Sequence, residues 1–392
     1  MNHDALEHIV PEEGTPRRKF LKNSLLLTVP ALVGGALLPK VSMAATYVPP
    51  TRMRGLTRLN VRNYGALGNG TSDDTAAIQA AINALPSDGG TVYIPAGTYM
   101  IDAVKSIRLR SKMHLELDPA AVLKAIPNGA EKAYVVLASK CTDVEISGGQ
   151  IIGERYGHLV TTGEWGHAIF IRGSQRVTIR DIRVADCYGD GISLGAAPVW
   201  QSAPIYSEDV AIANVVSTNN RRQALTIGRA KYVQVHDSEF SNSNGVKPQT
   251  GIDIEPDMPD EGGIADRITI KNCVIRGNRT YGINIFKGAR NITIRGCTIE
   301  ENGSCGLVTV GCTGIYIAVN TVRRNSATGI FIQYDTTNCQ ISQNTFYDNY
   351  LRLGDVDRTA FSLYGWDKKV ERDLLYRGEG IVDLRITTNY YR

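Results

Sequence analysis

Three carboxylates alternate along one short segment of the sequence, and their spacing suits acid–base chemistry. Asp253, Glu255 and Asp257 occupy every second position of this segment. Because successive side chains of a strand point to opposite faces, an extended segment would direct all three carboxylates to the same side. Like charges so close together raise one another's pKa, which suits proton transfer or the binding of a cation. This segment is therefore the first candidate for a catalytic site.

Other polar and aromatic side chains fall at or beside corresponding positions of neighbouring repeats, or in the loops next to them. The predicted catalytic residues are Asp190, Arg222, Asp253 and Glu255. The predicted substrate-binding residues are His167, Trp200, Arg221, Gln223, Tyr281 and Lys287. Two insertions, residues 196–205 and residues 245–249 with 256–263, interrupt the repeats here. Loops beside a flat sheet form the walls of a cleft, so we expect Trp200 of the first insertion to stack on a sugar ring.

Hydrolysis of a glycosidic bond is the first reaction that these residues could catalyse. One carboxyl group protonates the leaving oxygen while another activates a water molecule. Strand residues two positions apart have Cα atoms roughly 6.6 Å apart, and Asp190, two coils away, would lie roughly 9.6 Å from the level of Asp253. Both separations leave room for the water of an inverting hydrolase. For the carbohydrate substrate that the family resemblance given below implies, we predict a cofactor-free glycoside hydrolase, and the adjacent Arg221 and Arg222 favour an acidic polysaccharide.

Two alternatives remain open. A polysaccharide lyase would use Asp253, Glu255 and Asp257 to hold Ca²⁺, an ion that prefers oxygen ligands. The groups that would neutralise the substrate carboxylate or act as the base are Arg221, Arg222, Tyr281 and Lys287. A non-catalytic polysaccharide-binding protein would need the groove but no carboxylates of tuned pKa.

Internal repetition indicates the elements that position these residues. A Val-x-Ile pattern occurs at residues 144–146 and 177–179 and recurs downstream, with its closest copies 23 or 24 residues apart. Each full coil also carries a second alternating segment, for example residues 282–285. Alternation directs every second side chain to the interior. The sequence therefore predicts an all-β fold, a right-handed parallel β-helix.

Asparagine recurs at one position of this repeat. Eight residues after the last residue of the Val-x-Ile pattern, five coils place Asn220, Asn278, Asn302, Asn325 and Asn349. Asparagine tolerates the left-handed backbone conformation that a tight corner needs. Stacked asparagines can also form hydrogen bonds along the axis, so we expect a ladder of them inside the corners.

The segment before the coils indicates a cap. Ile78, Ala81, Ile82 and Leu85 share one face of an expected helix. Such an N-terminal capping helix would cover the open apolar end of the solenoid.

A family resemblance appears in the same region. Residues 61–70, 72–74 and 89–99 resemble the entry segment of the pectate-lyase-like β-helix superfamily, which includes lyases, epimerases, hydrolases and phage depolymerases. The resemblance implies a carbohydrate substrate. Asp190 is similar to the aspartate of the first polygalacturonase motif, but Arg222 and Gln223 replace the paired aspartates. The Gly-His-Gly of polygalacturonases and the Asp-Pro-His of epimerases are also replaced or missing, so the resemblance does not identify the reaction.

The start of the chain is typical of a twin-arginine export signal. Arg17 and Arg18 precede an apolar stretch, residues 25–38. We expect residues 1–44 to be removed and the protein to be exported folded, to the periplasm or outside the cell. Residues 45–392 would form one β-helix domain, with a cap at about 58–100, coils at about 101–350 and an aromatic-rich C-terminal cover at about 351–392.

The composition and charge of the sequence limit the classes of partner that the protein can bind. The net charge is +4 without a basic run, which argues against nucleic acid. No second apolar segment of spanning length follows the signal, so we expect no membrane contact after cleavage. Seven cysteines without paired metal spacing argue against a disulfide framework. The expected partner is a polysaccharide or oligosaccharide, and the sequence does not determine the oligomeric state.

Overall fold

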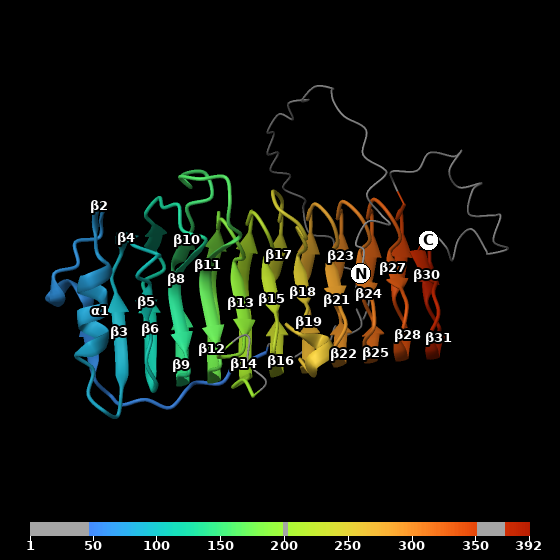
Figure 1. Ribbon diagram of the computed structural model, residues 1–392, viewed down its shortest axis with the longest axis horizontal. Coiled ribbons are helices and arrows are strands. Elements are labelled where there is room, and N and C mark those ends of the chain that lie inside the picture. The colour runs from blue at the N-terminus through green and yellow to red at the C-terminus, as the bar shows by residue number, and fades with distance from the viewer. Residues whose placement is uncertain (1–46, 199–202, 351–372) are drawn as a thin grey trace, which may run out of the picture. The chain divides into compact units, whose positions relative to one another are not determined.

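The computed structural model describes residues 47–198, 203–350 and 373–392 (Figure 1). The predicted export signal, residues 1–44, lies outside the described residues, and so do Trp200 and residues 351–372 of the predicted C-terminal cover. The named strands of the described part pair in parallel and belong to a 22-stranded and a 10-stranded sheet. The fold is therefore an all-β parallel β-helix, as the repeat predicts.

Each complete coil contributes one strand to each of three parallel ladders. The 10-stranded sheet is one ladder, with the strands β5 (Ile107–Arg108), β8 (Lys132–Ser139), β11 (Trp165–Arg172), β13 (Ile192–Gly195), β15 (Leu225–Ile227), β18 (Ile252–Ile254), β21 (Ile283–Ile285), β24 (Leu307–Thr309), β27 (Ile330–Ile332) and β30 (Leu374–Tyr376). It holds the second alternating segment of each repeat and carries the candidate site.

The 22-stranded sheet contains the other two ladders. The first holds the Val-x-Ile segments and consists of β1 (Arg58–Asn60), β3 (Gly90–Ile94), β6 (Met113–Leu117), β9 (Thr142–Ser147), β12 (Gln175–Ala185), β14 (Ser207–Thr218), β16 (Ala230–His236), β19 (Ala265–Lys271), β22 (Ala289–Arg295), β25 (Thr313–Ala318), β28 (Thr337–Ser342) and β31 (Val382–Thr387). The second contains the ends of β12 and β14 together with β2 (Asn69–Asp73), β4 (Gly97–Ile101), β7 (Ala121–Ala125), β10 (Gln150–Ile152), β17 (Glu239–Ser241), β20 (Val274–Arg276), β23 (Thr298–Glu300), β26 (Thr321–Arg323), β29 (Thr345–Tyr347) and β32 (Tyr390–Tyr391). The sequence analysis did not identify this second ladder.

The interior is filled by columns of aliphatic side chains from successive coils. Val233, Ile268, Ile292 and Ile315 pair in register from β16 to β25, and all four are buried. All seven cysteines are also buried and carry free thiols. Because the interior residues stack at a fixed register, the outward-facing residues of successive coils are aligned too. This alignment positions the side chains of the site.

The predicted asparagine ladder is present, but its backbone conformation differs from the expectation. Asn278, Asn302, Asn325 and Asn349 are joined by hydrogen bonds of 2.9 Å from each Nδ2 to the next Oδ1. None of them has a positive φ; the preceding residue does instead, for example Glu301 with a φ of 56°. The prediction that asparagine itself turns the corner was therefore wrong. The buried amide satisfies neighbouring backbone groups while the preceding, outward-facing residue takes the left-handed conformation.

Helical segments are short and few in the described part of the chain. They are α1 (Thr75–Asn83), η2 (Val61–Tyr64) and η3 (Pro259–Glu261). α1 buries Ile78, Ala81 and Ile82 and lies beside the first strands of the ladders (Figure 1); its function as a cap stays a prediction. Among the residues described, no helix has the length and apolar character required to cross a bilayer.

Candidate active site

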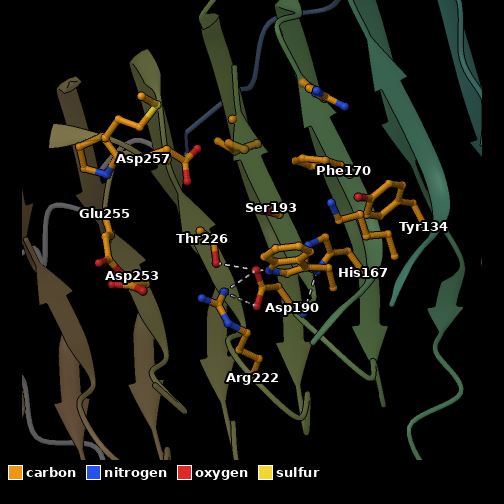
Figure 2. Close-up of a pocket in the computed structure, with 18 of the residues that line it drawn as sticks. Tyr134, His167, Phe170, Asp190, Ser193, Arg222, Thr226, Asp253, Glu255 and Asp257 are labelled. Atoms are coloured by element: carbon orange, nitrogen blue, oxygen red, sulfur yellow. Dashed lines mark hydrogen bonds and ion pairs between the residues drawn. The ribbon is translucent and has the colours of Figure 1, made fainter. Parts of the chain in front are cut away.

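A cleft of about 460 Å³ lies on the outer face of the 10-stranded sheet, over β8 to β18. Figure 2 shows the residues that line it, which come from five consecutive coils. The register aligns Phe170, Ser193, Thr226 and Asp253 in one outward column, as the repeat predicts. The cleft is therefore built by the pairing of strands that are far apart in the sequence.

Asp253 is the most perturbed carboxyl group of the cleft. Its side chain is 1% exposed, Asn284 Nδ2 donates a hydrogen bond of 2.8 Å to Oδ1, and Gln223 Nε2 donates to Oδ2. Burial, with repulsion from Glu255 as a second cause, raises the pKa of Asp253 to about 8. Asp253 therefore carries a proton at neutral pH although it sits among hydrogen-bond donors.

Glu255 and Asp257 follow on the segment that leaves β18, and both line the cleft. Glu255 is exposed to solvent, whereas Asp257 is partly buried. Burial raises the pKa of Asp257, and Arg229, which donates to the Asp257 backbone oxygen at 2.7 Å, partly opposes this shift. No group of three His, Cys, Asp or Glu side chains in the described ranges could hold a metal ion, and both oxygens of Asp253 already accept amide hydrogen bonds. The calcium site of the lyase alternative stays a prediction, and we derive no step through it.

Asp190 and Arg222 form a buried ion pair at the floor of the cleft. Arg222 Nη1 lies 3.2 Å from Asp190 Oδ1, and its Nε lies 3.1 Å from Glu164 Oε2. Thr226 Oγ1 donates to Asp190 Oδ2 at 2.8 Å. Burial alone would lower the pKa of Arg222, but the surrounding carboxylates raise it well above its usual value. Arg222 is therefore a permanent cation just before β15, the strand that pairs with β18 and Asp253.

His167 is held in one tautomer by its neighbours. Its Nδ1 accepts a hydrogen bond of 2.9 Å from the backbone N–H of Asp190, so the proton of the neutral ring resides on Nε2. Burial lowers the pKa of His167 and keeps the ring uncharged. The ring stacks on Tyr134, with centroids 5.5 Å apart, and lines the cleft. His167 can therefore donate a hydrogen bond to a sugar hydroxyl.

The other predicted binding residues have different positions. Gln223 is fully buried, and its Nε2 donates a hydrogen bond to Asp253 Oδ2. Arg221, Tyr281 and Lys287 do not line the cleft; Lys287 pairs instead with Asp260. Trp200 lies outside the described residues.

Arg221 instead anchors the segment that enters the cleft. Its guanidinium carbon lies 4.0 Å from the centre of the Tyr188 ring, and Nη1 donates to the Gly163 backbone oxygen at 2.8 Å. Gly163 immediately precedes Glu164 and Trp165. Arg221 is therefore a positioning residue for two side chains of the site.

Residues from the upstream coil were missed as members of the site. Lys132, Tyr134, Glu164 and Trp165 belong to or precede β8 and β11, and all but Glu164 line the cleft. The register pairs Tyr134 with His167, and the same 33-residue spacing separates the Val-x-Ile segments of these coils. Extending the outward columns one coil upstream would have found Lys132 and Tyr134.

Two family models match the chain. One is described as a right handed beta helix region and matches residues 205–373. The other is described as rhamnogalacturonase A/epimerase, pectate lyase-like, and matches residues 58–155. The second match includes the segments that carry the resemblance described above.

Curated relatives share parts of the chain. The uncharacterized protein YclG of Bacillus subtilis is 30% identical over 327 residues, which cover 78% of this chain and 55% of YclG. An iota-carrageenase of Alteromonas macleodii is 40% identical over 103 residues, which cover 26% of this chain and 20% of the carrageenase. The chain thus spans about half, or less, of the length of these relatives.

Solved structures share the fold. The A-module of the mannuronan C-5 epimerase AlgE6 of Azotobacter vinelandii superposes with a TM-score of 0.61 at 18% identity. The match covers 85% of this chain and 98% of that module. The chain is thus similar to a right-handed β-helix family model over residues 205–373 and to a pectate lyase-like family model over residues 58–155, and it shares its fold with the solved structure.

Proposed function

We propose that this protein hydrolyses glycosidic bonds of an acidic polysaccharide, with Asp253 as the general acid and Glu255 as the general base. The observation that carries the proposal is the pairing of a buried, protonated Asp253 with an exposed Glu255 in one cleft. When their surroundings hold two carboxyl groups in different protonation states, the protonated group acts as the acid and the ionised group as the base. A mannuronan epimerase and an iota-carrageenase among the relatives support a polysaccharide substrate.

In the proposed reaction, the Asp253 proton moves to the glycosidic oxygen as its bond to the anomeric carbon breaks. Glu255 removes a proton from a water molecule, whose oxygen forms the new bond to that carbon. The amides of Gln223 and Asn284 stabilise the carboxylate that Asp253 becomes. Arg222, held by Asp190, adds a fixed positive charge beside it. His167 donates to a hydroxyl group of the bound sugar.

The substrate and the products test this proposal. Incubation of the purified protein with polygalacturonate, alginate, iota-carrageenan and neutral glycans should release reducing ends from an anionic polymer. Hydrolysis produces no unsaturated uronide, whereas β-elimination produces one reducing end and one ultraviolet-absorbing unsaturated end per cleavage. Unsaturated products would replace the hydrolase by a lyase. Specific binding without any cleavage would favour a binding protein.

We also propose export by the twin-arginine route, because Arg17 and Arg18 precede the apolar stretch of residues 25–38. A fusion of residues 1–45 to a reporter that folds before transport should reach the periplasm. Replacement of both arginines by lysine should retain the reporter in the cytoplasm.

The pH dependence of kcat/KM should show an alkaline limb near pH 8. Asp253 acts in its protonated form, so activity is retained below its pKa of about 8 and is lost as the pH rises through that value. The Asn284 hydrogen bond favours the carboxylate, so Asn284→Ala should raise the pKa and shift the limb to higher pH. The limb is measured from initial rates across neutral and alkaline pH. An unchanged limb in Asn284→Ala would exclude Asp253 as its source.

A further inference from the structure

Two cations that line the cleft, Lys132 and Arg172, have no carboxylate partner among the residues that the structure describes. Lys132 contacts the ring of Trp165, with Nζ 4.6 Å from the ring centre, and Arg172 donates only to the Ala196 backbone oxygen, at 3.3 Å. Neither forms an ion pair within the described ranges. Arg222, in contrast, is paired with two carboxylates. Lys132 pairs with Trp165, seven residues before Arg172 on β11, so roughly 23 Å along the strand separates the two levels. Arg172 is therefore the unpaired cation that lies level with Gly195.

A glycine floor, Gly195 and Gly228, separates Arg172 from Glu255 of the acidic pair. Arg172 pairs with Gly195, and Gly228 and Glu255 continue the same outward column. Each strand step is about 4.8 Å, so Arg172 and Glu255 lie roughly 14 Å apart along the sheet. A Cβ atom on Gly195 would meet nothing closer than Phe170 Cε2, at 3.7 Å. A Cβ atom on Gly228 would instead lie 3.0 Å from the Leu194 backbone oxygen, so the open space of the floor lies over Gly195.

We infer that the glycine floor holds the sugar unit adjacent to the one that is cleaved, and that Arg172 binds an anionic group on that unit. Glu255 and the acidic residues near it would repel an anionic group of the substrate, so this group must lie at the Arg172 end of the glycine floor. Phe170, two residues before Arg172 on β11, lines the cleft and offers an apolar face to a sugar ring. Carboxylate and sulfate share the required chemistry. The position relative to the cleaved unit rests on the proposed function, whereas the charge recognition does not.

Binding without turnover tests this inference. Glu255→Gln serves as the parent, and its affinity for polygalacturonate, alginate and iota-carrageenan is measured by calorimetry beside that for their carboxyl-reduced or desulfated derivatives. Arg172→Met in this parent should weaken binding of the preferred anionic polymer about tenfold or more, because a charged hydrogen bond is lost. The affinity of the Arg172→Met variant for the neutral derivative should equal that of the parent. The polymer that responds identifies carboxylate or sulfate as the recognised group.

Two further variants complete the test. Arg183→Met removes the same charge from an exposed position of β12, in the other sheet, and should change neither affinity. Gly195→Val should fold like the parent, because the site accepts a Cβ and valine favours strands. It should weaken the binding of both the anionic polymer and its neutral derivative, because the valine side chain fills the glycine floor. The inference would be overturned if Arg172→Met and the parent bound every anionic polymer with equal affinity. It would also be overturned if the parent bound none of the anionic polymers. Hydrolysis by the wild-type protein without any preference of the parent for the anionic polymer would refute the subsite alone. Charge-dependent binding without hydrolysis would refute only the proposed reaction.

Discussion

Asp253→Asn should lower kcat at least about a hundredfold on a natural polysaccharide and change KM little, because a general acid contributes roughly 10²- to 10⁴-fold. Asparagine has the shape of aspartic acid but cannot supply the proton. Its amide would face the donors of Gln223 and Asn284. Asn284 can turn its side-chain amide to present the oxygen, so the fold should persist. Initial rates measured by reducing-end release test the expected loss.

An activated leaving group distinguishes acid catalysis from damage to the site. An aryl glycoside with an acidic phenol needs little protonation as the bond breaks, so Asp253→Asn should recover most of its activity on it. Glu255→Gln should stay impaired on both substrates because water still requires a base. Asp260→Asn, an exposed change in the neighbouring insertion, is the matched control and should retain full activity. Equal impairment of Asp253→Asn on both substrates would show that Asp253 is not the acid.

The columns of the site could be predicted because they follow from regular geometry. A fixed coil and strict alternation determine which residues share a face, so Asp253 and Glu255 could be placed together from spacing alone. Burial could not be predicted in the same way. Gln223 lies one coil from Asp253, yet it is fully buried and donates to that carboxyl group. Sequence periodicity gives the face of a residue but not how deeply its neighbours cover it.

Irregular segments explain the remaining differences. Arg221 was expected to face substrate, but the path of residues 154–165 brings the Gly163 carbonyl and the Tyr188 ring to it instead. Lys287 was expected on the same surface and pairs with Asp260 of an insertion. These partners come from loops without a repeat, where no register predicts which groups meet. Long cationic side chains are the most affected, because they reach whichever acceptor a loop provides.

The asparagine ladder leads to the largest expected effect on stability. Asn302 is fully buried. Its Nδ2 donates to Asn325 Oδ1 at 2.9 Å and to the Ile275 backbone oxygen at 3.2 Å, and its Oδ1 accepts from both nitrogens of Asn278. Asn302→Ala would leave several of these groups buried without a partner, at roughly 1–3 kcal/mol each. We expect a loss of about 3 kcal/mol or more in the free energy of unfolding.

Asn220 offers a control at the same position of an earlier coil. It is equally buried but lies outside the run of stacked asparagines, accepting from the Cys187 N–H at 3.1 Å and donating to Ser217 Oγ at 3.1 Å. Asn220→Ala therefore breaks fewer hydrogen bonds and should shift the denaturant midpoint less than Asn302→Ala. Both midpoints are measured by tryptophan fluorescence and circular dichroism. Because each coil of a solenoid is stabilised by its neighbours, the Asn302 variant should also open locally, with faster amide hydrogen exchange in β20 and β23 than in β10. Equal midpoints for the two variants would show that stacking the amides adds nothing beyond their separate backbone contacts.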